Sequence, residues 1–286
     1  MATNETRTPP SLFVCITGQA ARLELQSKKK VLLDPLGSWA RLKMSLLLST
    51  GSAQYANPLP HDGQSMQSPS LDQISFRVHD IIPDAEVVDY TRGPNPLVHQ
   101  RYLERLDKSP QTNRRRVSSH VRQWTASAAC FGRMEMWERS RTMFFDYFIR
   151  VREDVVLLSL SKTYVFRHLQ GDTVLAPECD SHKNGMNDKI AFGTRSSAFS
   201  YFTAPLLHYV NGALPNISLL NPEQYWLWSI IHEGLRFERV PSAALSALGS
   251  RRKSDRTCLK CTRKFVTCYT RGLNNDEYHK LIASCC

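Results

Sequence analysis

Two basic and two acidic residues lie together near the middle of the chain, where Arg150 and Arg152 precede Glu153 and Asp154. The preceding residues have the apolar, β-rich character of a strand, and strand alternation puts both arginines on one face. In open α/β sheets, ligands bind outside the carboxyl ends of strands. Arginines leading to carboxylates at such an end suit a diphosphate and its divalent cation, which binds carboxylate and phosphate oxygens. A surface salt-bridge cluster is an equally good interpretation of the spacing alone.

A second polar cluster runs from Glu178 to Lys189 and includes Asp180, His182 and Asp188. It follows another strand-like segment, and its acids and histidine offer several groups for a metal or a proton. Asp188 leads directly into an apolar run, which should fix its backbone, and a fixed carboxylate is what a general base requires. Because Asp, Asn and Gly are also ordinary loop formers, a plain turn is the alternative.

The third candidate is Glu223, which follows Asn221 and Pro222. A capping Asn, a Pro in the first turn and an acid near the positive end of the dipole predict a helix that begins here. Glu223 therefore has a structural explanation, and a functional role is optional. Tyr225 and Trp228 can form a stacking face on the same helix, although core packing explains them as well.

Five of the eight cysteines lie near the C-terminus, and Cys258 and Cys261 have the spacing of half a zinc site. The possible second pair is irregular, so a zinc site is not favoured. The other three cysteines are scattered, and we expect them to be buried or free. With no secretion signal at the N-terminus, a disulfide framework is not expected.

Strand-like and helix-like segments alternate along the chain, which predicts an α/β domain with a mostly parallel sheet. Strands are predicted at 12–17, 39–48, 74–82, 143–151, 173–177 and 235–240. Helices are predicted at 19–33, 97–106, 117–141, 196–210 and 222–232. Residues 1–10 are interpreted as a disordered arm, 11–241 as the ligand-binding domain, and 242–286 as a basic, Cys-rich tail that can be disordered.

The chain of 286 residues carries a net charge of +11, much of it in clusters at Lys28–Lys30, Arg114–Arg116 and Arg251–Lys264. Charge runs are usually solvated faces, and we interpret each cluster in that way, with an anionic ligand as the alternative. Nucleic acid ranks last among the anionic partners, because the clusters are dispersed and no binding signature accompanies them.

No apolar run approaches the length of a membrane span, so no integral membrane segment is expected. The polar, proline-containing N-terminus is not a secretory signal, which predicts a cytosolic protein. An incomplete N-terminus would instead allow the lumen of the Golgi or endoplasmic reticulum.

Several motifs taken in order resemble a group of glycosyltransferase-like families that includes the WavE-type lipopolysaccharide synthesis proteins. The matching segments are the opening strand that ends at Gly18 and Gln19 with Arg22 after it, Arg150-x-Arg152-x-Asp154, Asn187-Asp188-Lys189-x-x-x-Gly193, and Pro222-Glu223-Gln224-Tyr225. The resemblance covers about residues 12 to 240. It implies a GT-A-like fold, a nucleotide-sugar donor, and Mn²⁺ or Mg²⁺.

By position, the resemblance implies that Asp154 and Asp180 bind the metal and that Asp188 and Glu223 are catalytic residues. Gly18, Gln19 and Arg22, with both arginines of the middle cluster, would bind the donor. The acceptor, whether glycan, lipid or protein, is not identified. A strict Asp-x-Asp metal motif is absent. The leading hypothesis is therefore a metal-assisted glycosyltransferase, and the alternative is a non-catalytic nucleotide- or glycan-binding protein on the same fold.

Overall fold

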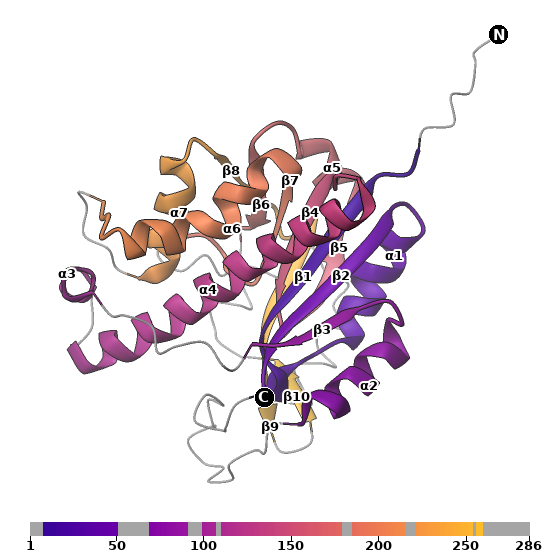
Figure 1. Cartoon of the computed structure of the whole chain (residues 1–286), viewed down its shortest axis with the longest axis horizontal. Coiled ribbons are helices and arrows are strands. Elements are labelled where there is room, and N and C mark those ends of the chain that lie inside the picture. Colours follow the sequence, from indigo (N-terminus) through magenta and orange to yellow (C-terminus); the bar gives the residue numbers. More distant parts are fainter. Residues whose placement is uncertain are drawn as a thin grey trace.

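The computed structural model describes residues 8–50, 69–90, 99–106, 110–178, 185–215, 221–253 and 256–259. A seven-stranded sheet with the spatial order β3-β2-β1-β4-β7-β6-β8 forms the centre of the molecule (Figure 1). Its strands are β1 (Ser11–Gln19), β2 (Arg41–Ser49), β3 (Glu86–Asp89), β4 (Tyr147–Arg152), β6 (Thr173–Pro177), β7 (Ile190–Thr194) and β8 (Arg236–Val240). Only β7 runs antiparallel to both neighbours. The predicted mostly parallel α/β sheet is confirmed, in an architecture consistent with a GT-A-like fold.

Helices cover both faces of this sheet, which explains why β1 is apolar without a break. Leu12, Val14 and Ile16 belong to one core, whereas Phe13 and Cys15 belong to the other, and all five are fully buried. The first core packs against α1 (Asp34–Gly37), α2 (Leu71–Ile81) and α5 (Lys162–His168). The second packs against α3 (Gln100–Leu103), α4 (Pro110–Arg141), α6 (Arg195–Val210) and α7 (Pro222–His232).

The predicted strand at 74–82 is wrong, because these residues form most of helix α2. Ser70 and Gln73 make a capping box at its start, in which each side chain bonds to the other residue's backbone N–H. Ile74 and Val78 are one helical turn apart and are both buried. The partial alternation of the segment suggested a strand, but the cap and this spacing favour the helix.

The single helix predicted at 19–33 is also wrong, since the segment forms separate short helical pieces. A 3₁₀ turn covers Ala20–Arg22, and a π-helix covers Lys28–Leu33 before α1. Lys28 is fully buried rather than solvated, and its Nζ donates to the backbone oxygens of Glu153 and Val155 at 3.0 and 2.5 Å. Burial lowers the pKa of Lys28 to about 8. Lys28 thus fixes the turn that follows β4.

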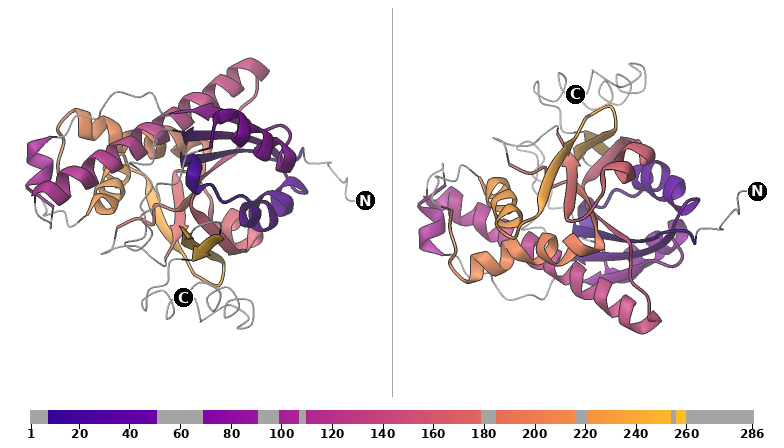
Figure 2. Two further views of the ribbon diagram at one scale, coloured as in Figure 1. Left: turned by 90° about the horizontal axis from the view of Figure 1, so that it is seen from below. Right: turned by 90° about the horizontal axis from the view of Figure 1, so that it is seen from above.

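A second, three-stranded sheet lies on the side of the molecule opposite α4 (Figure 2). It joins β5 (Val155–Leu160) to β9 (Leu245–Lys253), and β9 to β10 (Arg256–Leu259). Strands β9 and β10 lie beyond residue 242, where the sequence analysis places the start of the basic tail. Folded structure therefore continues past that point. Cys258 of the zinc hypothesis lies on β10, whereas Cys261 and the later cysteines lie outside the described residues.

Cys15 on β1 and Cys130 on α4 form a disulfide in the second core. Both residues are fully buried, in agreement with the expectation that they are buried or free, whereas the bond between them departs from the expectation that no disulfides form. The sequence separation of 115 residues hid the pair, because only packing α4 onto the sheet brings the two thiols together. Among the described helices, none combines the length and the apolar character needed to cross a membrane.

Candidate functional site

The parallel strands β1 and β4 end side by side, with Thr17 opposite Arg152, so the residues after them share one edge of the sheet. Gly18 has a φ of +142°, which side-chain-bearing residues rarely adopt. A Cβ on Gly18 would lie 1.8 Å from Oε2 of Glu153. Glycine at this position therefore lets the first residue after β4 pack directly against the end of β1.

Asp154 is held by two arginines, one from each strand end. Arg152 donates from Nε to Oδ1 at 3.1 Å and from Nη2 to Oδ2 at 3.0 Å, so the two side chains form a bidentate ion pair. Arg22, from the 3₁₀ turn after β1, contacts Oδ2 of Asp154 through Nη2. Its Nε also lies 3.7 Å from Oε1 of Glu153. The acid is buried, whereas the side chains of Arg22 and Arg152 are 26% and 25% exposed.

Arg152 also reaches the second predicted acid. Its Nη1 donates to Oδ2 of Asp188 at 2.8 Å, and Nε2 of Gln123 on α4 donates to the same oxygen at 3.0 Å. Asp154 and Asp188 are 34 residues apart in sequence but share one guanidinium. The two acidic clusters of the sequence therefore meet at one place in the fold.

Arg150 is the buried support of this arrangement. It is fully buried, and it donates to the backbone oxygen of Asp188 and, at 3.2 Å, to Oγ1 of Thr17. Its guanidinium lies 5.0 Å from the ring of Trp226 on α7, a cation–π contact. Burial lowers the pKa of Arg150. This arginine joins β1, β4, α7 and the Asp188 loop, which suits a positioning role.

The environment of Asp188 strongly favours its charged form. Burial alone would raise the pKa of this carboxyl, but Arg152 and then Arg150 outweigh burial and lower it to about 2. The hydrogen bond from Gln123 acts in the same direction. A carboxylate with so low a pKa is a weak acceptor of protons near neutral pH. The position of Asp188 instead suits a role in holding the Arg152 side chain in place.

Glu223 lies at the start of α7, where the predicted helix and its Asn221 cap are confirmed; Oδ1 of Asn221 accepts from Gln224 N at 2.8 Å. A Cβ on Gly185 would lie 2.7 Å from the backbone carbon of Glu223, so the Asp188 loop passes directly over this helix start. Oε2 of Glu223 is buried and has no hydrogen-bond partner among the described residues. Burial would lower the pKa of Arg152, but its acidic neighbours raise it, with Asp188 as the main contributor and Glu223 as a smaller one.

The structure brings most of the predicted site residues together. Those placed at this one edge are Gly18, Gln19, Arg22, Arg150, Arg152, Asp154, Asp188 and Glu223. Asp180 lies outside the described residues. The sequence analysis missed Gln123, Thr17 and Lys28. None of these three has a local signal, because each acts on a partner at least 60 residues away.

The carboxylates in this arrangement do not fit a divalent cation. Each oxygen of Asp154 already accepts from a guanidinium, and no group of three or more His, Cys, Asp or Glu side chains within the described ranges is arranged to hold a metal. At an effective dielectric constant of about 20, a divalent cation ~5 Å from one guanidinium meets a repulsion on the order of 6 kcal/mol. The expected Mn²⁺ or Mg²⁺ stays a prediction that needs either Asp180 or a rearrangement of the arginines.

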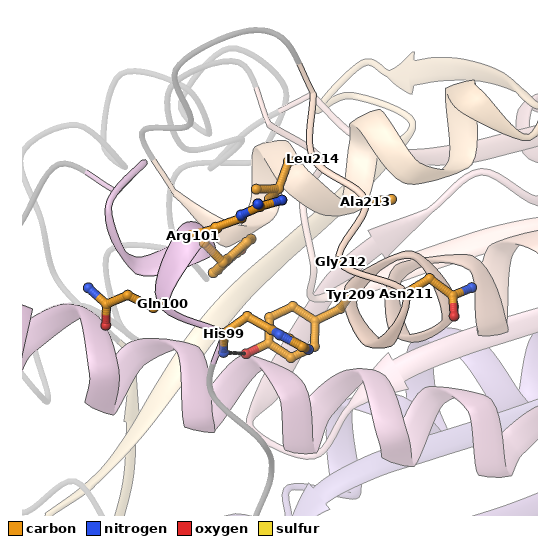
Figure 3. Close-up of a pocket in the computed structure, with 9 residues that line it drawn as sticks. His99, Gln100, Arg101, Tyr209, Asn211, Gly212, Ala213 and Leu214 are labelled. Carbon is orange, nitrogen blue, oxygen red and sulfur yellow. Dashed lines mark hydrogen bonds between the residues drawn. The ribbon is translucent and has the colours of Figure 1, made fainter.

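A separate cavity of about 360 Å³ lies between the start of α3 and the end of α6 (Figure 3). Within the part of the chain that the structure describes, its lining comes from two short segments, residues 99–102 and 209–214. The backbone N–H of His99 donates to Oη of Tyr209 at 2.8 Å, which ties the two segments together. None of the predicted site residues that the structure describes lines this cavity.

Neither a family model nor a curated protein matches the sequence. Among solved structures, the fold is similar to the apo-form glycosyltransferase GlyE of Streptococcus pneumoniae TIGR4. The identity is 11%, the TM-score is 0.41, and the match covers 81% of this chain. The chain spans 46% of the length of that structure.

Proposed function

We propose that this chain is a glycosyltransferase that moves a sugar from a nucleotide-sugar donor to an acceptor hydroxyl. The observation that carries the proposal is the arginine–carboxylate cluster at the carboxyl ends of β1 and β4, built on Arg22, Arg152, Asp154 and Asp188. Ligands of open α/β sheets bind at this edge. The ordered resemblance to WavE-type proteins supports the same reaction, with glycan, lipid and protein as the acceptor classes.

On the donor side, Arg22 and Arg152 bind the diphosphate. The three bonds from Arg152 to Asp154 and Asp188 use three of the five N–H donors of a guanidinium. The acids orient both arginines, and the quarter of each arginine side chain that is exposed can reach phosphate oxygens. Fixed cations of this kind stabilise the negative charge that develops on a departing diphosphate.

On the acceptor side, Glu223 takes the proton. A bond forms between the acceptor oxygen and the anomeric carbon as the bond from that carbon to the diphosphate breaks. The hydroxyl proton then passes to the carboxylate of Glu223, which is partly exposed and whose Oε2 is unpartnered among the described residues. Asp188, predicted from the sequence as the base, is instead proposed to hold Arg152, because its oxygen already accepts from Arg152 and Gln123.

The direct test is an assay of nucleoside diphosphate release from a panel of nucleotide sugars, with and without a mixture of sugar, lipid and peptide acceptors. Each donor is assayed with Mn²⁺ and with EDTA, so that the result does not depend on the metal. We expect turnover of at least one donor, and its loss in Arg152→Met. A folded protein that neither binds nor turns over any donor would refute the proposal.

The second candidate is a protein that binds a nucleotide sugar or a glycan without turnover. It is favoured by the pairing of the predicted metal residue Asp154 and the predicted catalytic residue Asp188 with arginines. Nucleoside diphosphate binding with no release of product in the same panel would support this candidate over the enzyme.

A further inference from the structure

We propose that the cavity between α3 and α6 is a saccharide-binding subsite that anchors a sugar residue of the acceptor. Its acceptor role rests on the proposed function, whereas sugar binding itself does not. At about 360 Å³, the cavity is at the small end of the range of roughly 300–1,000 Å³ for small-molecule sites. This volume suits one or two sugar rings rather than a nucleotide sugar.

The walls of the cavity combine rings with polar groups, as sugar recognition requires. The rings of His99 and Tyr209 lie edge to face with their centroids 4.8 Å apart. Figure 3 shows Arg101 and Leu214 together on the other side of the space from these rings. A sugar ring presents C–H groups that pack against aromatic faces, and hydroxyls that pair with polar groups placed around them.

One polar atom of the lining residue His99 lacks a partner among the described residues. Nε2 of His99 is buried and makes no hydrogen bond to any described residue. A buried polar group without a hydrogen bond costs free energy, and a ligand that supplies the bond recovers it. A hydroxyl can both donate and accept, so it pairs with this nitrogen in either tautomer of the imidazole. Gln100 and Arg101 are exposed and add donors for further hydroxyls at the rim.

The cavity is supported by a rigid aromatic cluster. The ring of Tyr209 lies 5.4 Å from that of Tyr102 and 5.5 Å from that of Trp124, which is fully buried. Oη of Tyr225 donates to the backbone oxygen of Ala213 at 3.0 Å and so fixes the loop after α6. A wall held in this way is formed before ligand arrives, which reduces the entropy lost on binding.

The same cluster connects the cavity to the candidate site. Trp124 is next in sequence to Gln123, whose side chain bonds to Asp188. The ring of Trp124 is also 5.1 Å from that of Tyr225, on the helix whose first turn contains Glu223. One aromatic layer therefore separates the cavity from the helix that carries Glu223, the acid on the acceptor side, which suits a subsite for a sugar at some distance from the reacting hydroxyl.

The test uses ligand-detected saturation-transfer NMR with the methyl glycosides of glucose, galactose, mannose, fucose, xylose and N-acetylglucosamine. We expect at least one to bind, and His99→Phe to weaken it by about tenfold through the lost hydrogen bond. Arg101→Ala should weaken it too, and because Arg101 is exposed this variant should fold normally. The matched control is Arg139→Ala, whose side chain is 79% exposed on α4 and does not line the cavity.

Uridine and guanosine diphosphate are titrated in parallel as probes of the donor site. No binding of any glycoside, or binding that both cavity variants leave unchanged, would overturn the subsite, whatever the diphosphates do. Diphosphate binding that survives in His99→Phe and Arg101→Ala would leave the proposed function standing. A protein that binds a glycoside but neither diphosphate would support the subsite and count against the proposed function.

Discussion

Arg152 donates from Nη1 to Oδ2 of Asp188 over 2.8 Å, and this bond joins the two acidic segments that the sequence places far apart. Nε and Nη2 of the same guanidinium donate to the carboxylate of Asp154. The carboxylates of the site are thus used to orient arginines. We therefore expect the arginines to bind phosphate and Glu223 to accept the proton. The pairing of Asp188 should make the stability of the protein depend on pH in acid.

The lowered pKa of Asp188 predicts a loss of stability in acid. The folded-state pKa, at about 2, lies below the unpaired value of 3.8, so the charged carboxylate stabilises the fold above pH 3.8. This contribution falls as pH decreases from about 3.8 to about 2 and is on the order of 2 kcal/mol. Urea unfolding between pH 2 and 6 should show this decrease in the free energy of unfolding for the wild type but not for Asp188→Asn. Parallel pH profiles for the two proteins would contradict the assignment.

Glu223 and Asp188 should differ in their effects on catalysis. Glu223→Gln removes the proton acceptor and should lower kcat by about 10²- to 10⁴-fold with little change in donor affinity. Asp188→Asn should mainly raise the KM for the donor, because it loosens Arg152. The control is Glu135→Gln on α4, a side chain that is 36% exposed and lies outside the candidate site, and this change should leave both constants unchanged. A larger loss of kcat in Asp188→Asn than in Glu223→Gln would return the role of base to Asp188.

Binding of a nucleoside diphosphate should depend on arginines more than on a divalent cation. Calorimetric titration of uridine or guanosine diphosphate should give similar affinities in EDTA and in Mn²⁺. Arg22→Met should weaken the binding by about tenfold, since charge-assisted hydrogen bonds are lost. Arg139→Met serves as the exposed control. Binding that disappears in EDTA would show that a metal site forms, with Asp180 as the first residue to test.

The disulfide between Cys15 and Cys130 should contribute strongly to stability. It closes a long loop, and removal of such a bond typically costs about 2–5 kcal/mol. The variant Cys15→Ala/Cys130→Ala should therefore unfold at a lower temperature than the oxidised wild type. Wild type in reducing agent is the matched control, because it lacks the bond but keeps both sulfurs.

Peptide mapping without reduction would show the crosslink directly. Structural disulfides persist in oxidising compartments and are rare in the cytosol. A crosslink found in protein purified from its native source would therefore indicate an oxidising compartment. Both thiols free in such protein would agree with the cytosolic prediction.

Much of the fold follows from local patterns in the sequence. The buried strands β1 and β6 are continuous apolar runs, and α7 begins with a capping Asn and a Pro. Such signals act over a few residues, so the sequence alone indicates them. The strand prediction for residues 74–82 is wrong because the apolar residues there fit partial alternation as well as helical spacing. The capping box at Ser70 favours the helix.

The sequence by itself therefore determined the alternation of strands and helices, and the presence of arginines and acids after two of the strands. Only the tertiary structure decided how those charges pair: Arg152 lies between Asp154 and Asp188, while Oε2 of Glu223 has no described partner. The physical reason is that ion pairs, the burial of Lys28 and the contact of Cys15 with Cys130 depend on distances between elements. Those distances are set by the packing of α4 and α7 on the sheet, which no short stretch of sequence encodes.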